Sequence, residues 1–214
     1  MLWAFWCNRI YYAHSNQSAA PPAKTGAPGE GECTDCHFGV LNPDSGSVNV
    51  NFFGEVAYNL GGVYSVEVNI SQTMSVYGFS LVALDANGAN AGSFNLTNTS
   101  NTKTASTAGK TYISHKDAVA QNTSSWSFEW VAPNTSMGDV IFYASGNAAN
   151  GDGGTGGDKV YTTTDTLTGP PANLNESSVS DIRVFPNPFS SGVFIEAKLF
   201  TASVTFSRIL DTFP

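Results

Sequence analysis

The feature that most constrains the fold is a series of short segments in which apolar and polar residues alternate. The clearest are residues 47–52, 64–70 and 126–130, where every second residue is apolar. In a strand, such alternation gives one apolar face and one polar face. Further strand-like segments, separated by Gly, Asn and Pro, are residues 77–88, 91–96, 110–115, 138–147 and 158–164. Because no stretch has a sustained helical period, the sequence predicts an all-β, antiparallel β-sandwich.

Charge and hydropathy exclude two classes of function. The chain has a net charge of −8 and only 12% charged residues, with no cluster of Lys and Arg. Nucleic-acid binding requires a basic surface, so this class is disfavoured. There is no apolar run of about 18 residues, so no transmembrane helix is expected.

Three aromatic residues share one face of a predicted strand, namely Trp126, Phe128 and Trp130. Burying each could contribute roughly 2–3 kcal/mol before entropy is counted. A sandwich core explains them more simply than a carbohydrate-binding platform does.

The N-terminus is apolar and then becomes small and polar. We interpret residues 1–19 as a truncated secretory signal segment, although no basic residue precedes Trp3. Export is expected mostly from the rest of the chain, and with it a secreted or surface-attached location reached through the periplasm.

A short motif carries the main chemical hypothesis: Cys33-Thr34-Asp35-Cys36-His37. In a c-type haem site, two cysteines at this spacing form thioethers with the haem, and the adjacent His binds the iron. Haem c, held by Cys33, Cys36 and His37, is therefore the leading interpretation.

Two alternatives to haem stay open. A disulfide between Cys33 and Cys36, or a degenerate site, would need no neighbouring His. A zinc clip would need a fourth ligand beyond these three residues, and only His115 or His14 could supply it. A thioredoxin-like pair is disfavoured, because the motif lies in a Gly-rich loop without a βαβ unit around it.

A haem iron would have a sixth position to fill. His115 ends a predicted strand and is the candidate sixth ligand, although a polar residue closing a strand explains it equally well. Met74 and Met137 are weaker candidates, since packed apolar side chains explain both more simply.

Residues 146–160 form a Gly-rich segment with Asn147, Asn150, Asp152 and Asp158. These oxygens could bind calcium, but their spacing is not that of an EF-hand, and a long hairpin loop is the simpler interpretation. Motifs of hydrolases, zinc proteases and nucleotide-binding loops are missing, so an enzyme is not expected.

The order of the central segments resembles a Reeler domain, the immunoglobulin-like sandwich named for the N-terminal module of reelin. The similarity spans residues 20–165 and rests on "GGVYSVEVNI", "YGFSLVALDANGANAGSFN", "TYISHKDA", "WSFEWVAP" and "GDVIFYASGNAANGDGG". It is strongest toward surface proteins of the Bacteroidetes type, in which a "TGAPGEGxCTxCH" segment precedes the first strand. Residues 25–37 fit this segment.

A second resemblance lies in "VFPNPFSSG", at residues 184–192. It is similar to the start of a type IX secretion C-terminal sorting domain, which implies the type IX secretion machinery as a partner. The tail departs from that family after Glu196, where the expected closing strands are cut short.

Together these features predict five regions, which are a truncated signal segment (1–19), a CxxCH-bearing loop (20–46), a Reeler-like β-sandwich (47–165), a linker (166–178) and a partial sorting domain (179–214). Two functions remain. One is a secreted or cell-surface, cytochrome c-like haem protein for electron transfer or haem-based binding. The other is a haem-free adhesion or interaction module.

Overall fold

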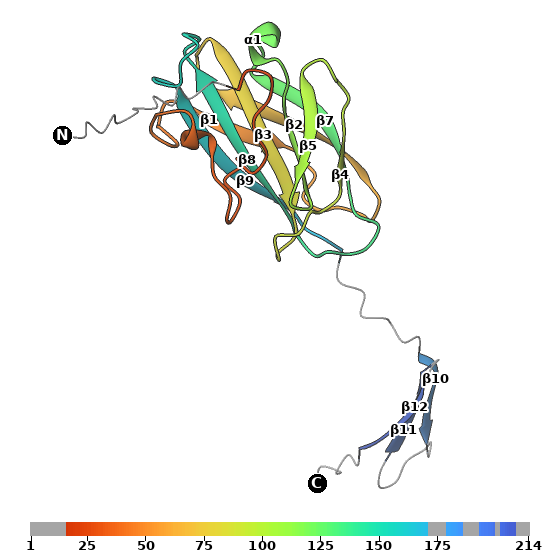
Figure 1. Cartoon of the computed structure of the whole chain (residues 1–214). Coiled ribbons are helices and arrows are strands. Elements are labelled where there is room, and N and C mark those ends of the chain that lie inside the picture. The colour runs from red at the N-terminus through yellow and green to blue at the C-terminus, as the bar shows by residue number, and fades with distance from the viewer. Residues whose placement is uncertain (1–15, 171–178, 186–192, 200–201, 209–214) are drawn as a thin grey trace, which may run out of the picture. The chain divides into compact units, whose positions relative to one another are not determined.

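The computed structural model describes residues 16–170, 179–185, 193–199 and 202–208. Contacts divide the chain into two units, and the boundary in the sequence lies between Pro170 and Pro171. The first unit is a sandwich of two antiparallel sheets (Figure 1). This confirms the predicted all-β sandwich.

The first sheet has four strands in the order β1-β2-β7-β4. They are β1 (Ser47–Asn51), β2 (Val63–Ser71), β7 (Ser125–Val131) and β4 (Ser93–Asn95). Its inner face carries the aromatic residues of β7, because Trp126, Phe128 and Trp130 alternate with polar residues and are all buried. These three side chains therefore form part of the core, as predicted.

The second sheet has five strands in the order β5-β6-β3-β8-β9. They are β5 (Thr102–Thr107), β6 (Lys110–His115), β3 (Val76–Leu84), β8 (Val140–Ala149) and β9 (Lys159–Leu167). Sequence patterning missed β5, since its residues are nearly all polar and it lies at the edge of the sheet. It also missed the four-residue helix α1 (Ala118–Gln121).

The core lies between the two sheets and is rich in aromatic side chains. Trp130 packs edge-to-face on Phe142, with ring centroids 5.0 Å apart, and on Tyr58, with ring centroids 5.4 Å apart. Phe79 of β3 packs against Trp126 at 4.7 Å. Such pairs add roughly 0.5–1.5 kcal/mol each to the gain from burial.

The central strand β3 is buried on both faces. Phe79, Leu81 and Ala83 face the core between the sheets, while Val82 and Leu84 point to the outer face and are also buried. A strand with two buried faces needs a second covering layer, and the chain before β1 supplies it.

The second unit contains β10 (Val179–Phe185), β11 (Val193–Leu199) and β12 (Ala202–Arg208). They pair as an antiparallel three-stranded sheet in the order β10-β11-β12. The chain after Glu196 thus continues through β11 and adds one more strand.

A candidate cofactor site on the outer face of the five-stranded sheet

The segment that precedes β1, residues 16–46, covers the outer face of the five-stranded sheet. Ala27 is buried and packs with Val82, Leu84 and Tyr112. Gly26 has a φ of 78°, and a Cβ built there would lie 3.2 Å from Thr162 Cγ2. The positive φ and this close approach both favour glycine at the point where the segment turns over β9.

Glu30 anchors this segment through a cluster of polar contacts. Its Oε1 accepts hydrogen bonds from Lys110 Nζ at 2.9 Å and from the Tyr112 hydroxyl at 2.7 Å. Its Oε2 accepts a hydrogen bond from Thr25 Oγ1 at 2.6 Å. Burial alone would raise the pKa of Glu30, but these hydrogen bonds outweigh it, so the pKa lies below its ordinary value.

The CxxCH motif begins in a 3₁₀ turn, Cys33–Asp35. The Cys33 carbonyl accepts hydrogen bonds from the backbone N–H groups of Cys36, at 3.2 Å, and of His37, at 2.8 Å. These two hydrogen bonds close one tight turn, and this turn keeps Cys33, Cys36 and His37 close together.

Cys33 lies against β8. Ser145 Oγ donates to Cys33 Sγ at 3.1 Å. Burial raises the pKa of the Cys33 thiol to about 11, although the Ser145 hydrogen bond acts in the opposite direction. A thiol that stays protonated at neutral pH is a poor redox nucleophile, which disfavours thioredoxin-like chemistry.

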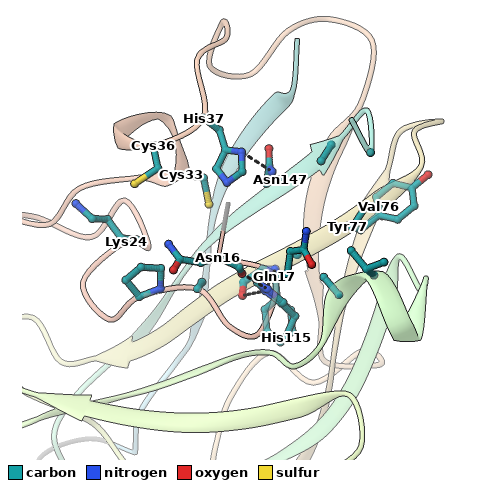
Figure 2. Close-up of a pocket in the computed structure, with 18 of the residues that line it drawn as sticks. Asn16, Gln17, Lys24, Cys33, Cys36, His37, Val76, Tyr77, His115 and Asn147 are labelled. Atoms are coloured by element: carbon teal, nitrogen blue, oxygen red, sulfur yellow. Dashed lines mark hydrogen bonds between the residues drawn. The ribbon is translucent and has the colours of Figure 1, made fainter. Parts of the chain in front are cut away.

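His37 is held by Asn147 of β8 and by Asp158, the residue before β9. Its Nδ1 lies 2.6 Å from Asp158 Oδ2 and 3.1 Å from Asn147 Nδ2. The Asp158 side chain is fully buried and that of His37 is 15% exposed. Figure 2 shows the other ring nitrogen of His37 turned toward the cavity below it.

His115 is buried at the end of β6. Its Nδ1 lies 3.1 Å from the Phe79 backbone N, and its Nε2 lies 3.2 Å from the Asn16 carbonyl oxygen. Gly78 makes room for the ring, since a Cβ at Gly78 would lie 2.7 Å from His115 Cε1. Burial lowers the pKa of His115, so its neutral form is favoured, which is the form that binds metals.

A cavity of about 90 Å³, partly open to solvent, lies between the CxxCH motif and His115. Figure 2 shows His37 and the two cysteines on one side and His115 on the opposite side. This volume is below the about 300–1,000 Å³ of typical small-molecule and cofactor sites, so a porphyrin would fit here only if the covering segment moved aside. Apolar lining comes mainly from side chains outside the motif, namely Ala20, Pro21, Val76, Tyr77, Ala118, Val119 and Ala149.

The structure therefore brings together four residues named from the sequence. Cys33, Cys36, His37 and His115 all line this cavity, although 78 residues separate the two His in the chain. The sequence alone offered few apolar residues near the motif to cover a porphyrin. In the structure, β3, β8 and α1 add apolar side chains to the lining of the cavity.

Other candidate residues lie elsewhere. Met74 and Met137 are partly buried and pack against the core. His14 lies outside the described residues. Cys33 and Cys36 are both free thiols in the structure, and in the described ranges no group of three or more His, Cys, Asp or Glu could hold a metal ion.

The Gly-rich loop uses its carboxylates internally. Asp152 Oδ1 accepts a hydrogen bond from Gly154 N at 2.7 Å, and Asp158 Oδ1 accepts one from Asn150 N at 3.0 Å. The second oxygen of Asp158 contacts His37. These contacts favour the structural interpretation of the loop over calcium binding.

Sequence reasoning missed the supporting residues of the site. Asp158 and Asn147 were considered only as calcium ligands, and Ser145 and Glu30 were not considered. No local signal could have found them, because their contacts with His37, Cys33 and Lys110 join positions at least 80 residues apart.

Comparison with known families agrees with this architecture. Residues 45–148 match the family model of the Reeler domain. Reeler domains are typically extracellular. No curated protein sequence matches the chain.

Solved structures of Reeler domains are also similar. The reelin-N domain of F-spondin is 20% identical, with a TM-score of 0.47, over 62% of this chain and 92% of that one. The human F-spondin reeler domain is 20% identical, with a TM-score of 0.48, over 62% of this chain and 95% of that one. In the described part of the chain, no helix is long and apolar enough to cross a membrane.

Proposed function

We propose that the chain is a c-type haem protein of the cell envelope or cell surface, which transfers electrons or binds small ligands at its iron. The observation that carries the proposal is the cavity lined by Cys33, Cys36, His37 and His115. A loop that is merely closed by a Cys33–Cys36 disulfide would need neither a His beside the second cysteine nor a second buried His on the opposite wall.

The donor set fits haem c. The two thiols would form the thioethers to the porphyrin, and His37 would bind the iron on the side of the CxxCH motif. When bound, the haem supplies one-electron and ligand-binding chemistry, and the protein's part is to orient and shield it. Val76 and Ala149 from the sheet and Val119 from α1 provide apolar cover.

His115 supports the proposal with one condition. Its Nε2 contacts the Asn16 carbonyl oxygen, so binding iron through this nitrogen requires that contact to break. The hydrogen would also have to move from Nε2 to Nδ1, where the Phe79 carbonyl oxygen 3.2 Å away would accept it and the hydrogen bond from the Phe79 N–H would be lost. His115 would therefore act as the sixth ligand only after its contact with the Asn16 carbonyl oxygen is broken.

The domain is expected to act as a carrier rather than as an enzyme. In the described residues, neither cysteine sulfur is hydrogen-bonded to His37, and Cys33 stays protonated at neutral pH. A nucleophilic Cys–His pair requires the opposite arrangement.

Covalent haem attachment is the direct test. The full chain is produced behind a working signal peptide, in a periplasm with the c-type maturation machinery. Haem-peroxidase staining of a denaturing gel and a reduced pyridine spectrum should then show haem that stays with the protein. The Cys36→Ala variant should lose one thioether, with a shifted pyridine spectrum or no haem, and Cys7→Ala should match the wild type.

The opposite result would favour the interaction module. A stable, folded protein without covalent haem, in which Cys33 and Cys36 are oxidised to each other, would overturn the haem proposal. The exposed side chains of Phe38 and Val40, 67% and 73% exposed, would then be the first candidates for a binding surface.

We also propose that residues 179–214 direct export through the type IX secretion machinery. The proposal is supported by the "VFPNPFSSG" motif and by the separate three-stranded sheet of β10, β11 and β12. Fusing residues 179–214 to a periplasmic reporter, in a bacterium with that machinery, should move the reporter to the cell surface. A reporter that stays in the periplasm would contradict the proposal.

A further inference from the structure

We infer that Asp158 is the positioning residue for His37, and that it keeps the Nε2 lone pair of His37 free and facing the cavity. This inference rests on the proposed function, because a free Nε2 is what an iron atom at this site would require. It gives a role to a carboxylate that the sequence pattern assigned only to a loop.

The contact itself fixes the position of a proton. Asp158 Oδ2 and His37 Nδ1 lie 2.6 Å apart, and the Asp158 side chain is fully buried. At this distance one hydrogen must lie between the two atoms, and a carboxylate can only accept it. Nδ1 therefore carries the hydrogen, and neutral His37 has its lone pair on Nε2. The Asn147 amide, whose nitrogen lies 3.1 Å from Nδ1, must then be turned so that its otherwise unpartnered oxygen faces this N–H.

Asp158 is in turn held on its other side. Its Oδ1 accepts a hydrogen bond from the Asn150 backbone N–H at 3.0 Å. The residue after the motif is hydrogen-bonded to the same loop, because Phe38 N donates to the Thr155 carbonyl at 2.7 Å. Gly39 permits the close approach, because a Cβ there would lie 2.5 Å from the Asp158 carbonyl oxygen.

A buried carboxylate behind a metal-binding His has a known consequence. It fixes the ring orientation and tautomer, and it increases the electron donation of the ring to the metal. Haem potentials respond to such hydrogen bonds. Asp158 should therefore favour the oxidised iron and lower its reduction potential.

The decisive substitution is Asp158→Asn. The Asn150 N–H needs an acceptor, so the new amide should place its oxygen there and turn its NH₂ group toward His37. Since that group can only donate, Nδ1 must accept, and the hydrogen of His37 must move to Nε2. The substitution thus removes the free lone pair while conserving the shape of the side chain.

The first readout needs no haem. In the full-length apo protein, ¹⁵N NMR of the imidazole should show hydrogen on Nδ1 of His37 in the wild type and on Nε2 in Asp158→Asn. Asp152→Asn is the matched control, because Asp152 lies in the same loop, is exposed and contacts other loop residues. It should leave the His37 spectrum unchanged.

The second readout uses the haem-loaded protein. Asp158→Asn should keep covalent haem, since both thiols remain, but should bind iron through His37 about 10–100-fold more weakly. Competition by added imidazole, followed in the visible spectrum, measures this loss, and redox titration should show a higher potential.

The outcomes separate this inference from the proposed function. Hydrogen on Nε2 of wild-type His37, or an unchanged tautomer in Asp158→Asn, would overturn the role of Asp158 whether or not haem is bound. The expected tautomers in a protein that never takes up haem would instead confirm the positioning and reject the haem function. The wild-type spectrum alone decides the tautomer even if the variant does not fold.

Discussion

The two faces of the five-stranded sheet are built in different ways. The inner face packs aromatic and aliphatic side chains against the other sheet, and its central residues are fully buried. The outer face is covered by residues 16–46, which are held largely by polar contacts of Glu30, Cys33 and His37. The cavity lies on the outer face, where packing is incomplete.

The difference concerns how each face is specified. Burial of apolar area is non-directional, so many apolar side chains can satisfy the inner face. The outer face depends on individual hydrogen bonds, which require particular atoms at particular distances. We therefore expect substitutions of the inner face to change stability most, and those of the outer face to change the site most.

The largest effect is expected from Trp130→Ala, which removes a side chain of the four-stranded sheet that packs against the inner face. Trp130 is fully buried, contacts Tyr58, Tyr64 and Phe142, and donates from Nε1 to the Ala91 carbonyl at 3.0 Å. Truncating a buried Trp leaves a cavity and costs about 3–5 kcal/mol of unfolding free energy. Urea denaturation followed by circular dichroism measures this loss.

The matched control is Val56→Ala, which removes an apolar side chain that is 75% exposed. It should change the free energy of unfolding by less than about 0.5 kcal/mol. A loss below about 1 kcal/mol for Trp130→Ala would show that the inner face is not the main source of stability.

The same contrast explains how much the sequence could predict. Alternation identified β2 and β7 and placed Trp126, Phe128 and Trp130 in the core, because a period of two residues reports directly on burial. The polar strand β5 carries no such signal. The CxxCH motif identified Cys33, Cys36 and His37 because their spacing is local.

The rest of the site depends on long-range geometry. His115 was named from the sequence as the candidate sixth ligand, with a polar residue closing a strand as an equal alternative, and only the structure shows that it lies on the wall opposite His37. Asp158 meets His37 across 121 positions of sequence, and a single sequence contains no record of such a pairing. The fold had to be known before the partners of the motif could be identified.

A smaller effect is expected from Gly78→Ala, which tests the outer face. The new Cβ would lie 2.7 Å from Cε1 and Nδ1 of His115, so the ring must move and lose its contacts with Phe79. Overpacking of this kind costs about 1–3 kcal/mol. Denaturation measures the loss, and NMR of the His115 ring shows the displacement.

Gly156→Ala is the control for this substitution, because nothing lies within 4 Å of a Cβ built at Gly156. It should leave both stability and the His115 signals close to those of the wild type. If Gly78→Ala also left the His115 signals unchanged, the ring would not be seated on Gly78, and the wall opposite His37 would be wrongly assigned.

The smallest effect is a dependence of stability on pH that arises from His115. Burial lowers the pKa of His115 in the folded protein below its ordinary value of 6.5. As the pH falls below about 6.5, the unfolded chain takes up a proton that the folded chain does not. The unfolded state is thereby favoured, so this contribution destabilises the protein in mild acid and vanishes above pH 7.

The variant His115→Gln should remove this contribution, because glutamine does not titrate. Unfolding free energies measured between pH 5 and 7.5 should then fall less steeply toward low pH than in the wild type. His37 and Lys103 influence His115 in the same direction, since positive charge on either opposes a second positive charge. Lys103→Gln should therefore only reduce the slope, and an equal slope in wild type and His115→Gln would contradict a neutral, buried His115 beside the cavity.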